Sequence, residues 1–461
     1  MNANKGHLDM YYTEGYLSAS KDKIISNSRL YRAAIDFGLD RYIITKTLAL
    51  HKWRPTYVED LIQTPPEFTS EREMSTKILA DVVEALIGAA FITGGTPMAM
   101  ECMSLFIPEV KWNSISANRE TLYDAAPADE ALPLTMEGLE DLIGYTFTKK
   151  SLLLEATTHP SYSAPGTRAS FDRLEFLGDA ILDYVVVKKL FYLNDPKPLE
   201  NNELHLLRTA LVNADILGFF VMEWCMEQES VDAEVEEAPA TAGTYRSKKD
   251  SSVINLVKSK VRIPLSSFMR SSSPELSMHM HNSWQRHEEM REELLCALYE
   301  GKSYPWSLLL GQKTQKVQSD LFEALIGAVW VDSGSVEACE AFIERAGILK
   351  LMRRLLRDDV HLMHPKEELG HFLSGKPAEY KVYVSKASAE GAEQEFGCDI
   401  LDNGICIASF QGGFSKEDAR VRAAEKACAF KREERENANK DKEKLDNLAA
   451  TAMTVDGGGD E

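Results

Sequence analysis

The chain has 461 residues, a hydrophobic fraction of 44% and a formal net charge of −20 at pH 7. That length suits roughly two to four domains, and the hydrophobic fraction is typical of a globular protein with sizeable cores. The negative charge argues against tight, non-specific binding to nucleic acid, but it does not exclude a local basic face.

Seven cysteines without a CxxC pair favour free thiols in a reducing compartment, so we expect an intracellular protein of the cytoplasm or nucleus. The first residues, 1–7, lack the apolar centre of a signal peptide. No apolar run looks long enough to cross a bilayer, so no membrane partner is expected.

An internal repeat organises most of the chain. Residues 77–89 read KILADVVEALIGA, and residues 316–328 read KVQSDLFEALIGA. Small residues at 93–95 and at 332–334 follow the two copies and suit helix ends. A weaker match lies upstream of each copy and contains Asn27 or Asn213. The repeat therefore predicts two similar, mainly helical domains.

We place the first of these domains at 1–110, a linker at 111–136 and the second domain at 137–357. The linker is marked by the sequence AAPADEALP at 125–133. The second copy is longer because it contains a polar and acidic insert near 227–282. The acidic run at 227–237 and the polar stretch at 247–252 predict a solvated loop there.

A different pattern follows at 362–432 and predicts a small α-β-β-β-α module. A short helix is expected at 366–372, and three strands are expected at 379–384, 395–401 and 405–410. Asn403 and Gly404 suit a hairpin turn between the last two strands. A helix at 415–432 would begin after Ser415 as its N-cap. The charged, then glycine-rich tail at 433–461 is expected to be disordered.

Four carboxylates carry the chemistry of the second repeat. Glu175 and Asp179 are four residues apart, and Asp320 and Glu323 are three apart, so each pair lies on one face of a helix. Either pair alone could be an exposed surface charge, but the apolar residues around them favour buried positions that need partners. Two such helices crossing would create a site for Mg²⁺ or Mn²⁺, and hence for phosphodiester hydrolysis.

These motifs resemble the ribonuclease III family. Residues 173–179 (RLEFLGD) look like its signature, residues 320–324 (DLFEA) look like its second acidic motif, and residues 158–162 (THPSY) resemble the segment before the signature. Tandem repeats resemble the C-terminal half of Dicer, most closely fungal Dicer-like proteins, over about residues 10–430. The resemblance implies an endonuclease for double-stranded RNA that makes small RNAs in RNA silencing and antiviral defence.

The resemblance also implies roles for residues of the second repeat. Glu175, Asp179, Asp320 and Glu323 would be the metal ligands. Lys316, one turn before Asp320, would neutralise the scissile phosphate, although it could be a plain surface lysine. The resemblance implies further that Asp172 would contact RNA or water. Asn213 and Asn27 would each lie near the site or be a satisfied core amide.

The first repeat departs from the family pattern. Asp81 and Glu84 could hold metal, and Lys77 matches Lys316, but no segment like 175–179 precedes them. We therefore expect a truncated first domain whose site binds metal poorly and is inactive. The two repeats would pair within the chain, or two chains would form a homodimer through their second repeats.

The C-terminal module loosely resembles a double-stranded-RNA-binding domain. Lys416, Arg420 and Arg422 match the basic start of its last helix and would contact phosphates. Glu417 weakens that charge, so a packing module without RNA affinity is the alternative. For the whole chain, the rival interpretation is a non-catalytic scaffold that binds double-stranded RNA. The complete set of acids in the second repeat argues against it.

Overall fold

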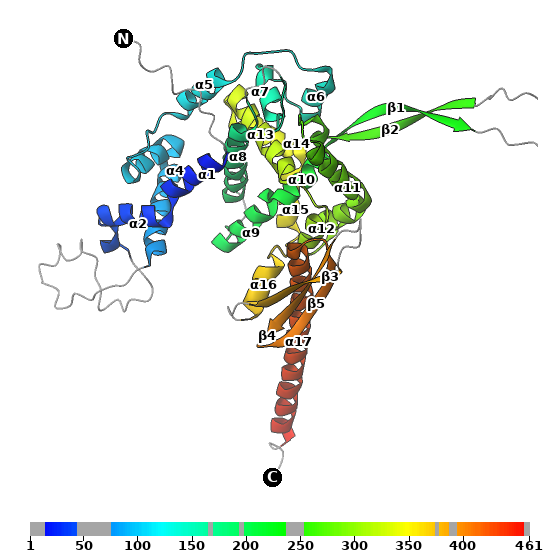
Figure 1. The fold of residues 1–461 in the computed structure, drawn as a ribbon. Helices are drawn as coiled ribbons and strands as arrows, with labels where there is room; N and C mark the ends of the chain where they lie inside the picture. Colours follow the sequence, from blue (N-terminus) through cyan, green and yellow to red (C-terminus); the bar gives the residue numbers. More distant parts are fainter. Residues whose placement is uncertain are drawn as a thin grey trace, which may run out of the picture.

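The structure is a computed structural model that describes residues 14–43, 75–164, 169–192, 198–236, 253–373, 378–386 and 394–455. It is mainly helical, with a two-stranded ribbon and a three-stranded sheet (Figure 1). The expected fold class, two helical repeats followed by a small α-β-β-β-α module, is confirmed.

The first repeat consists of three described α-helices and one short 3₁₀ helix. These are α1 (Glu14–Ile25), α2 (Asn27–Asp36), η1 (Leu39–Arg41) and α4 (Thr76–Phe106). Ser26 and Ser75 cap α2 and α4, because each side chain accepts a backbone N–H from the first helical turn. Leu30, Leu79 and Phe106 belong to a small core between α2 and α4.

Helix α4 is broken where the small residues predict an end. Gly94 and Gly95 have non-helical backbone angles, and Gly95 has φ +65°. The expectation that no segment is apolar and long enough to cross a bilayer is wrong for α4, which meets both criteria. Helices α9 (Asn201–Val212) and α10 (Ala214–Glu223) would also meet them if their bent pair were one span. Since α13 (Lys316–Ser333) repeats the sequence of α4 within a protein core, we assign α4 to the folded first repeat.

The segment at 111–136, which we predict to be a linker, is partly helical. It contains α5 (Ile115–Ala125) and η2 (Leu134–Met136). The guanidinium of Arg119 donates to the carbonyl oxygens of Val331, at 2.7 Å, and Asp332. These bonds satisfy carbonyls at the end of α13, so α5 is attached to the second repeat.

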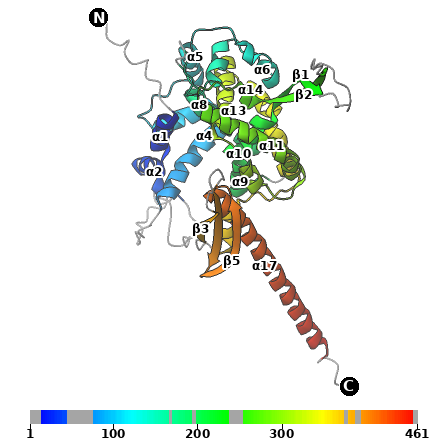
Figure 2. The same ribbon diagram turned by 45° about the vertical axis from the view of Figure 1, so that its right-hand side comes forward.

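The second repeat is a bundle of helices around the buried α13. In chain order these are α6 (Leu139–Ile143), α7 (Lys150–Ala156), α8 (Asp172–Phe191), α9 (Asn201–Val212), α10 (Ala214–Glu223), η3 (Leu265–Phe268), α11 (Pro274–Glu300), α12 (Trp306–Gly311), α13 (Lys316–Ser333), α14 (Val336–Ala346) and α15 (Ile348–Arg357). Helix α13 packs against α7, α8, α10 and α14 in the centre of this bundle (Figure 2). Gly334 ends α13 in the left-handed conformation, as the sequence predicts.

Helices α8 and α13 cross in close contact at two glycines. A Cβ added to Gly178 would lie 1.7 Å from the carbonyl oxygen of Glu323. A Cβ added to Gly327 would lie 2.2 Å from the carbonyl oxygen of Leu174. Neither position has room for a side chain, so the two backbones meet where only glycine fits.

The insert of the second repeat is a β-ribbon, not the solvated loop that its acidic composition predicts. Strands β1 (Cys225–Glu236) and β2 (Val253–Pro264) pair antiparallel from Cys225↔Pro264 to Glu236↔Val253. The ribbon projects away from the helices (Figure 1). At its described base, Glu227 pairs with Lys260 at 2.8 Å. The polar stretch at 247–252 lies outside the described residues.

The C-terminal module has the predicted order of elements: α16 (Pro365–Phe372), β3 (Glu379–Lys386), β4 (Glu395–Asp402), β5 (Ile405–Gly413) and α17 (Lys416–Val455). The sheet order is β3-β4-β5. Asn403 and Gly404 both have positive φ, as a two-residue hairpin turn requires. Ser415 caps α17, as predicted. The expected disordered tail at 433–461 is wrong as far as Val455, because α17 continues to that residue.

The glycine crossing generates a stability prediction. Alanine is favoured over glycine within a helix by about 1 kcal/mol. In Gly178→Ala, the collision with the backbone of α13 outweighs that gain, and we expect a net loss of about 2 kcal/mol or more. The matched control is Gly88→Ala in the first repeat, because a Cβ there meets nothing within 4 Å. Chemical denaturation should show a loss for the first variant and none for the second; equal stabilities would contradict the close crossing.

Candidate functional site

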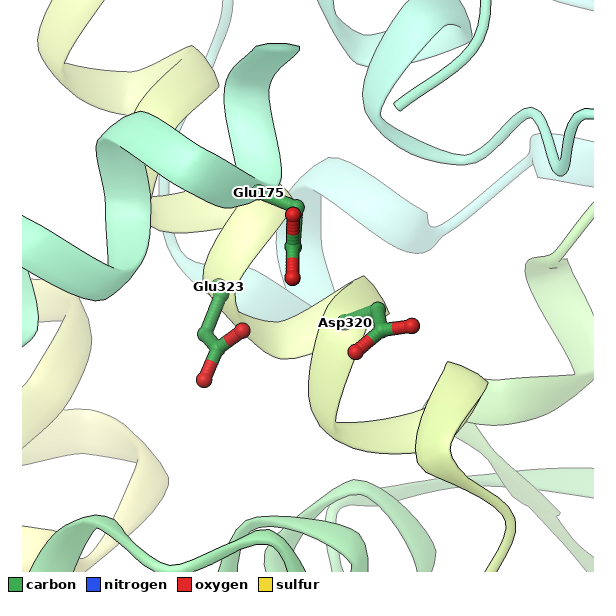
Figure 3. Close-up of side chains that lie close together, drawn as sticks. All are labelled: Glu175, Asp320 and Glu323. Atoms are coloured by element: carbon green, nitrogen blue, oxygen red, sulfur yellow. The ribbon is translucent and has the colours of Figure 1, made fainter. Parts of the chain in front are cut away.

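Three of the four predicted ligands converge in the second repeat. Glu175 comes from α8, and Asp320 and Glu323 come from successive turns of α13 (Figure 3). One carboxylate oxygen from each lies within 4.8 Å of the others. We call these three residues the acidic cluster. Glu175 is far in sequence from Asp320 and Glu323, and the crossing of the two helices brings them together.

The crossing explains why the acids meet. Gly178 is one turn after Glu175 on α8, and its contact is the backbone of Glu323 itself. Asp320 lies one turn earlier on α13, on the same side of that helix. Apolar residues on the other faces of both helices are buried in the main core, which holds the carboxylates together against their repulsion.

Asp179, the fourth predicted ligand, is not part of the group within 4.8 Å. Its negative charge nevertheless acts on the cluster, because it is among the causes that raise the pKa of Glu323. It also acts on Arg208 of α9, whose pKa is raised mainly by its hydrogen bond to Asp183. Asp179 therefore contributes to the electrostatics of the acidic cluster, although it is outside the group of three.

Glu323 shows the electrostatic cost of the cluster. Burial and, after it, the negative charges of its three acidic neighbours together raise its pKa to about 9, against a smaller opposing effect of the Lys316 cation. The donor set consists of carboxylate oxygens, without sulfur or imidazole ligands. Hard divalent cations prefer such oxygens, and their charge would relieve this repulsion, so the residues fit a metal ion of that class.

Lys316 bridges the two helices at the cluster. Its Nζ donates to Oδ1 of Asp320 at 2.8 Å and to Oε1 of Glu175 at 3.3 Å. Burial lowers its pKa, but the hydrogen bond to Asp320 and the nearby carboxylates raise it more, so the net shift is upward. The side chain is 69% exposed, so a protonated amine faces both the acids and solvent. That position suits contact with an anionic ligand.

The first repeat reproduces only half of this arrangement. Lys77 donates to both carboxylate oxygens of Asp81, at 3.0 and 2.8 Å, whereas Lys316 donates to Oδ1 of Asp320. The side chain of Asp81 is 48% exposed, against 11% for Asp320. Glu84 is exposed too, and within the described ranges no third metal-binding side chain joins the pair. Asp81 and Glu84 thus remain a solvated pair.

Asn213 is placed as a structural amide, which is one of the two predicted alternatives. Its side-chain oxygen accepts the backbone N–H of Ile216 at 3.0 Å, and its amide donates to the carbonyl oxygens of Thr209 and Ala210. It joins the end of α9 to the start of α10. These bonds satisfy both ends of the amide, so Asn213 fixes the junction between α9 and α10.

Sequence reasoning assigned no role to His159, although it lies in the recognised segment before the signature. Its Nδ1 accepts the backbone N–H of Ser161 at 3.0 Å. Its ring packs edge-on against the ring of Phe171, with 5.7 Å between the two ring centres. Burial lowers its pKa, partly offset by the charges of Asp172 and Asp320. The ring is therefore within electrostatic reach of Asp320.

The three predicted RNA-binding residues of the module have different surroundings. Lys416 is exposed at the start of α17. Arg420 lies 3.5 Å from Glu417, and Arg422 donates to Asp418 at 2.7 Å. Two of the three cations thus have acidic partners on the same helix, and among the contacts of the described residues Lys416 has none. The positive charge at the start of α17 is therefore partly neutralised.

Comparison with known proteins agrees with the resemblance. The family model described as "Ribonuclease III domain" matches residues 6–95 and 172–334, together more than half of the chain. "Dicer-like protein 2" of Cryphonectria parasitica is 45% identical over 434 residues, which cover 93% of this chain and 30% of that protein. The protein of the same name from Pyricularia oryzae is 44% identical over 430 residues, covering 90% of this chain and 28% of the relative.

A third relative, "Dicer-like protein 2" of Neurospora crassa, is 38% identical over 470 residues, covering 93% of this chain and 30% of its own length. The chain thus spans about three-tenths of these relatives. Among solved structures, the nuclease domain of ribonuclease III from Campylobacter jejuni is 23% identical, with a TM-score of 0.26, covering 47% of this chain and 96% of that one. On the match to the family model, the chain belongs to the ribonuclease III domain family.

Proposed function

We propose that the chain is a metal-dependent endoribonuclease that cleaves double-stranded RNA at its second repeat. The observation that carries the proposal is the convergence of Glu175, Asp320 and Glu323 within 4.8 Å beside the cation of Lys316. A cluster of this kind has no stabilising purpose of its own, because buried like charges repel. The strongly raised pKa of Glu323 in such a place favours catalysis over a purely structural role.

Mg²⁺ or Mn²⁺ is the cofactor that the donor set fits, with Asp179 completing the four acidic ligands. When bound, such an ion supplies an activated water and stabilises charge on the phosphate and its leaving oxygen. The carboxylates that would hold this ion are positioned by two helices that cross in close contact at Gly178 and Gly327. Lys316 binds the scissile phosphate with its exposed amine while it holds Asp320 in position.

The two repeats pair within the chain in this proposal. The amine of Lys21 on α1 lies 5.5 Å from the centre of the Phe176 ring on α8. Phe91 of α4 packs edge-on against Tyr184 of α8, with 6.2 Å between ring centres. The first repeat, with its solvated acids, serves as a pairing partner without cutting. A single chain then nicks one strand, unless two chains pair through their second repeats.

Double-stranded RNA is selected by the shape of its grooves and its 2′-hydroxyls rather than by base sequence. We infer a role in small-RNA production during RNA silencing and antiviral defence, supported by the likeness to Dicer-like proteins. All seven cysteines are free, which supports a location in the cytoplasm or nucleus. The rival is a scaffold that binds duplex RNA without cutting it.

Metal binding should release a proton. With no metal bound, the raised pKa of Glu323, about 9, keeps this group protonated at pH 7.5, whereas a cation requires the carboxylate. Affinity for Mn²⁺ should therefore rise as the pH increases towards 9 and then level off. Calorimetry in buffers of different ionisation enthalpy should detect about one proton released per site. Glu323→Gln should abolish that release, and Glu84→Gln should not; proton-free binding by the unsubstituted chain would contradict this.

Cleavage should depend on the second repeat alone. Asp320→Ala should lower the rate of Mg²⁺-dependent cutting by roughly a hundredfold or more while binding of duplex RNA is retained. The matched variant Asp81→Ala in the first repeat should cut normally. Denaturing gels with each strand labelled should show one strand cut per dilute monomer. Equal cutting of both strands would rule out a single active site, and binding without any cutting would favour the scaffold.

A further inference from the structure

A polar hollow of about 390 Å³ lies between α11 and the loop that leads into α13. All eight lining residues are polar: His279, Asn282, Ser283, Gln285, Arg286, Glu289, Lys313 and Gln315. Pockets for small organic ligands are lined mainly by apolar side chains, so this hollow suits a charged or strongly hydrogen-bonding ligand instead.

The hollow is built on a fixed frame. The hydroxyl of the buried Ser283 donates to the carbonyl oxygen of Lys313 at 2.7 Å, which ties the loop to α11. One turn later on α11, the fully buried His287 is hydrogen bonded to Gln312 at 3.0 Å. Gln315 then forms a capping box with Gln318 at the start of α13. A ligand would therefore meet groups that are already in place.

The charge of the hollow contrasts with that of the chain. His279, Asn282 and Arg286 follow one another at helical spacing along one face of α11, and all three can donate hydrogen bonds. Lys313 adds a second full positive charge from the loop. Glu289 is the single acid among the eight lining residues, in a chain with a net charge of −20. The local balance favours an anion.

Its position connects the acidic cluster with the C-terminal module. Gln315 directly precedes Lys316, which is hydrogen bonded to Asp320 and Glu175. On the other side, the amine of Lys313 lies 4.9 Å from the centre of the Phe414 ring, two residues before Lys416. Helix α12, which leads into this loop, packs against the start of α17 (Figure 1). The hollow thus lies between the two places that we expect to meet RNA.

We propose that this hollow binds phosphodiester groups of the duplex-RNA backbone and seats the duplex between the acidic cluster and the C-terminal module. The inference rests on the proposed function and adds a binding site to it. Full charges on Arg286 and Lys313 recognise phosphate, and the side chains of Asn282 and His279 add hydrogen-bond donors beside them. No Phe, Tyr or Trp side chain lines the hollow, so its lining suits the RNA backbone better than stacked bases.

The test uses the full chain without divalent metal, so that binding is measured apart from cutting. Lys313 has φ +52°, a conformation that asparagine tolerates better than most residues, so the double variant is Arg286→Ala with Lys313→Asn. The probe is a duplex RNA longer than the roughly 16 base pairs that a double-stranded-RNA-binding domain covers. The control is Arg357→Ala, an exposed arginine at the end of α15 and outside the hollow.

Titrations at several salt concentrations should give a dissociation constant roughly tenfold weaker for the double variant. The slope of log affinity against log salt should also fall by about two, one for each lost phosphate contact. Arg357→Ala should keep the original constant and slope, and thermal unfolding should confirm that all variants fold. An unchanged constant and slope in the folded double variant, or absence of duplex binding by the unsubstituted chain, would overturn the proposal.

Two further measurements distinguish binding of the RNA backbone from binding of free phosphate, and failure of this proposal from failure of the proposed nuclease activity. At matched ionic strength, inorganic phosphate should not compete with the duplex; competition that the double variant loses would assign the hollow to a free ion and overturn the proposal. Cleavage of the same duplex is then measured with Mg²⁺. A chain that never cuts, yet loses affinity in the double variant, would refute the proposed nuclease activity and leave the phosphate site supported.

Discussion

The contact of α8 with α13 at Gly178 and Gly327 is the constraint on which the site depends. It brings two helix backbones to a separation that no side chain would permit. Carboxylates on either side of this contact must then converge, although their charges repel one another. The opposing force is apolar burial, because both helices contribute to the large core of the second repeat. The acidic cluster is therefore held together by packing around it, and a divalent cation would remove a repulsion that the fold already withstands.

Much of this site could be predicted because helix geometry fixes the face on which a residue lies. Spacings of three and four residues placed Asp320 beside Glu323 and Glu175 beside Asp179, and the structure brings the first three together. Asp179 shows the limit of that reasoning. Spacing gives a common face but not the crossing point, and Asp179 lies one turn further along α8 than Glu175. The C-terminal module was equally predictable, since strand alternation and the turn at 403–404 are local signals.

The features that sequence reasoning missed depend on contacts between distant residues. An acidic run suggests a solvated loop, yet Glu227 belongs to a strand whose partner, Lys260, comes from beyond the polar stretch of the insert. The linker helix α5 owes its place to Arg119, which reaches carbonyl groups at the end of α13. The polar hollow also needs Ser283 to meet the carbonyl of Lys313. No local sequence pattern predicts such contacts, because each partner taken alone is a polar residue of the kind that is common on protein surfaces.

The two copies of the sequence EALIGA end in opposite environments. In α13, Ala324, Leu325 and Gly327 are buried, whereas the equivalent residues of α4 at 85, 86 and 88 are exposed. Exposed apolar surface costs roughly 25 cal/mol for every Å² left in water. An exposed apolar face of this kind favours binding to any partner that removes it from water, such as detergent, lipid or another polypeptide. The repeat whose acids remain solvated thus leaves this apolar face in water, whereas the repeat that holds the acidic cluster buries it.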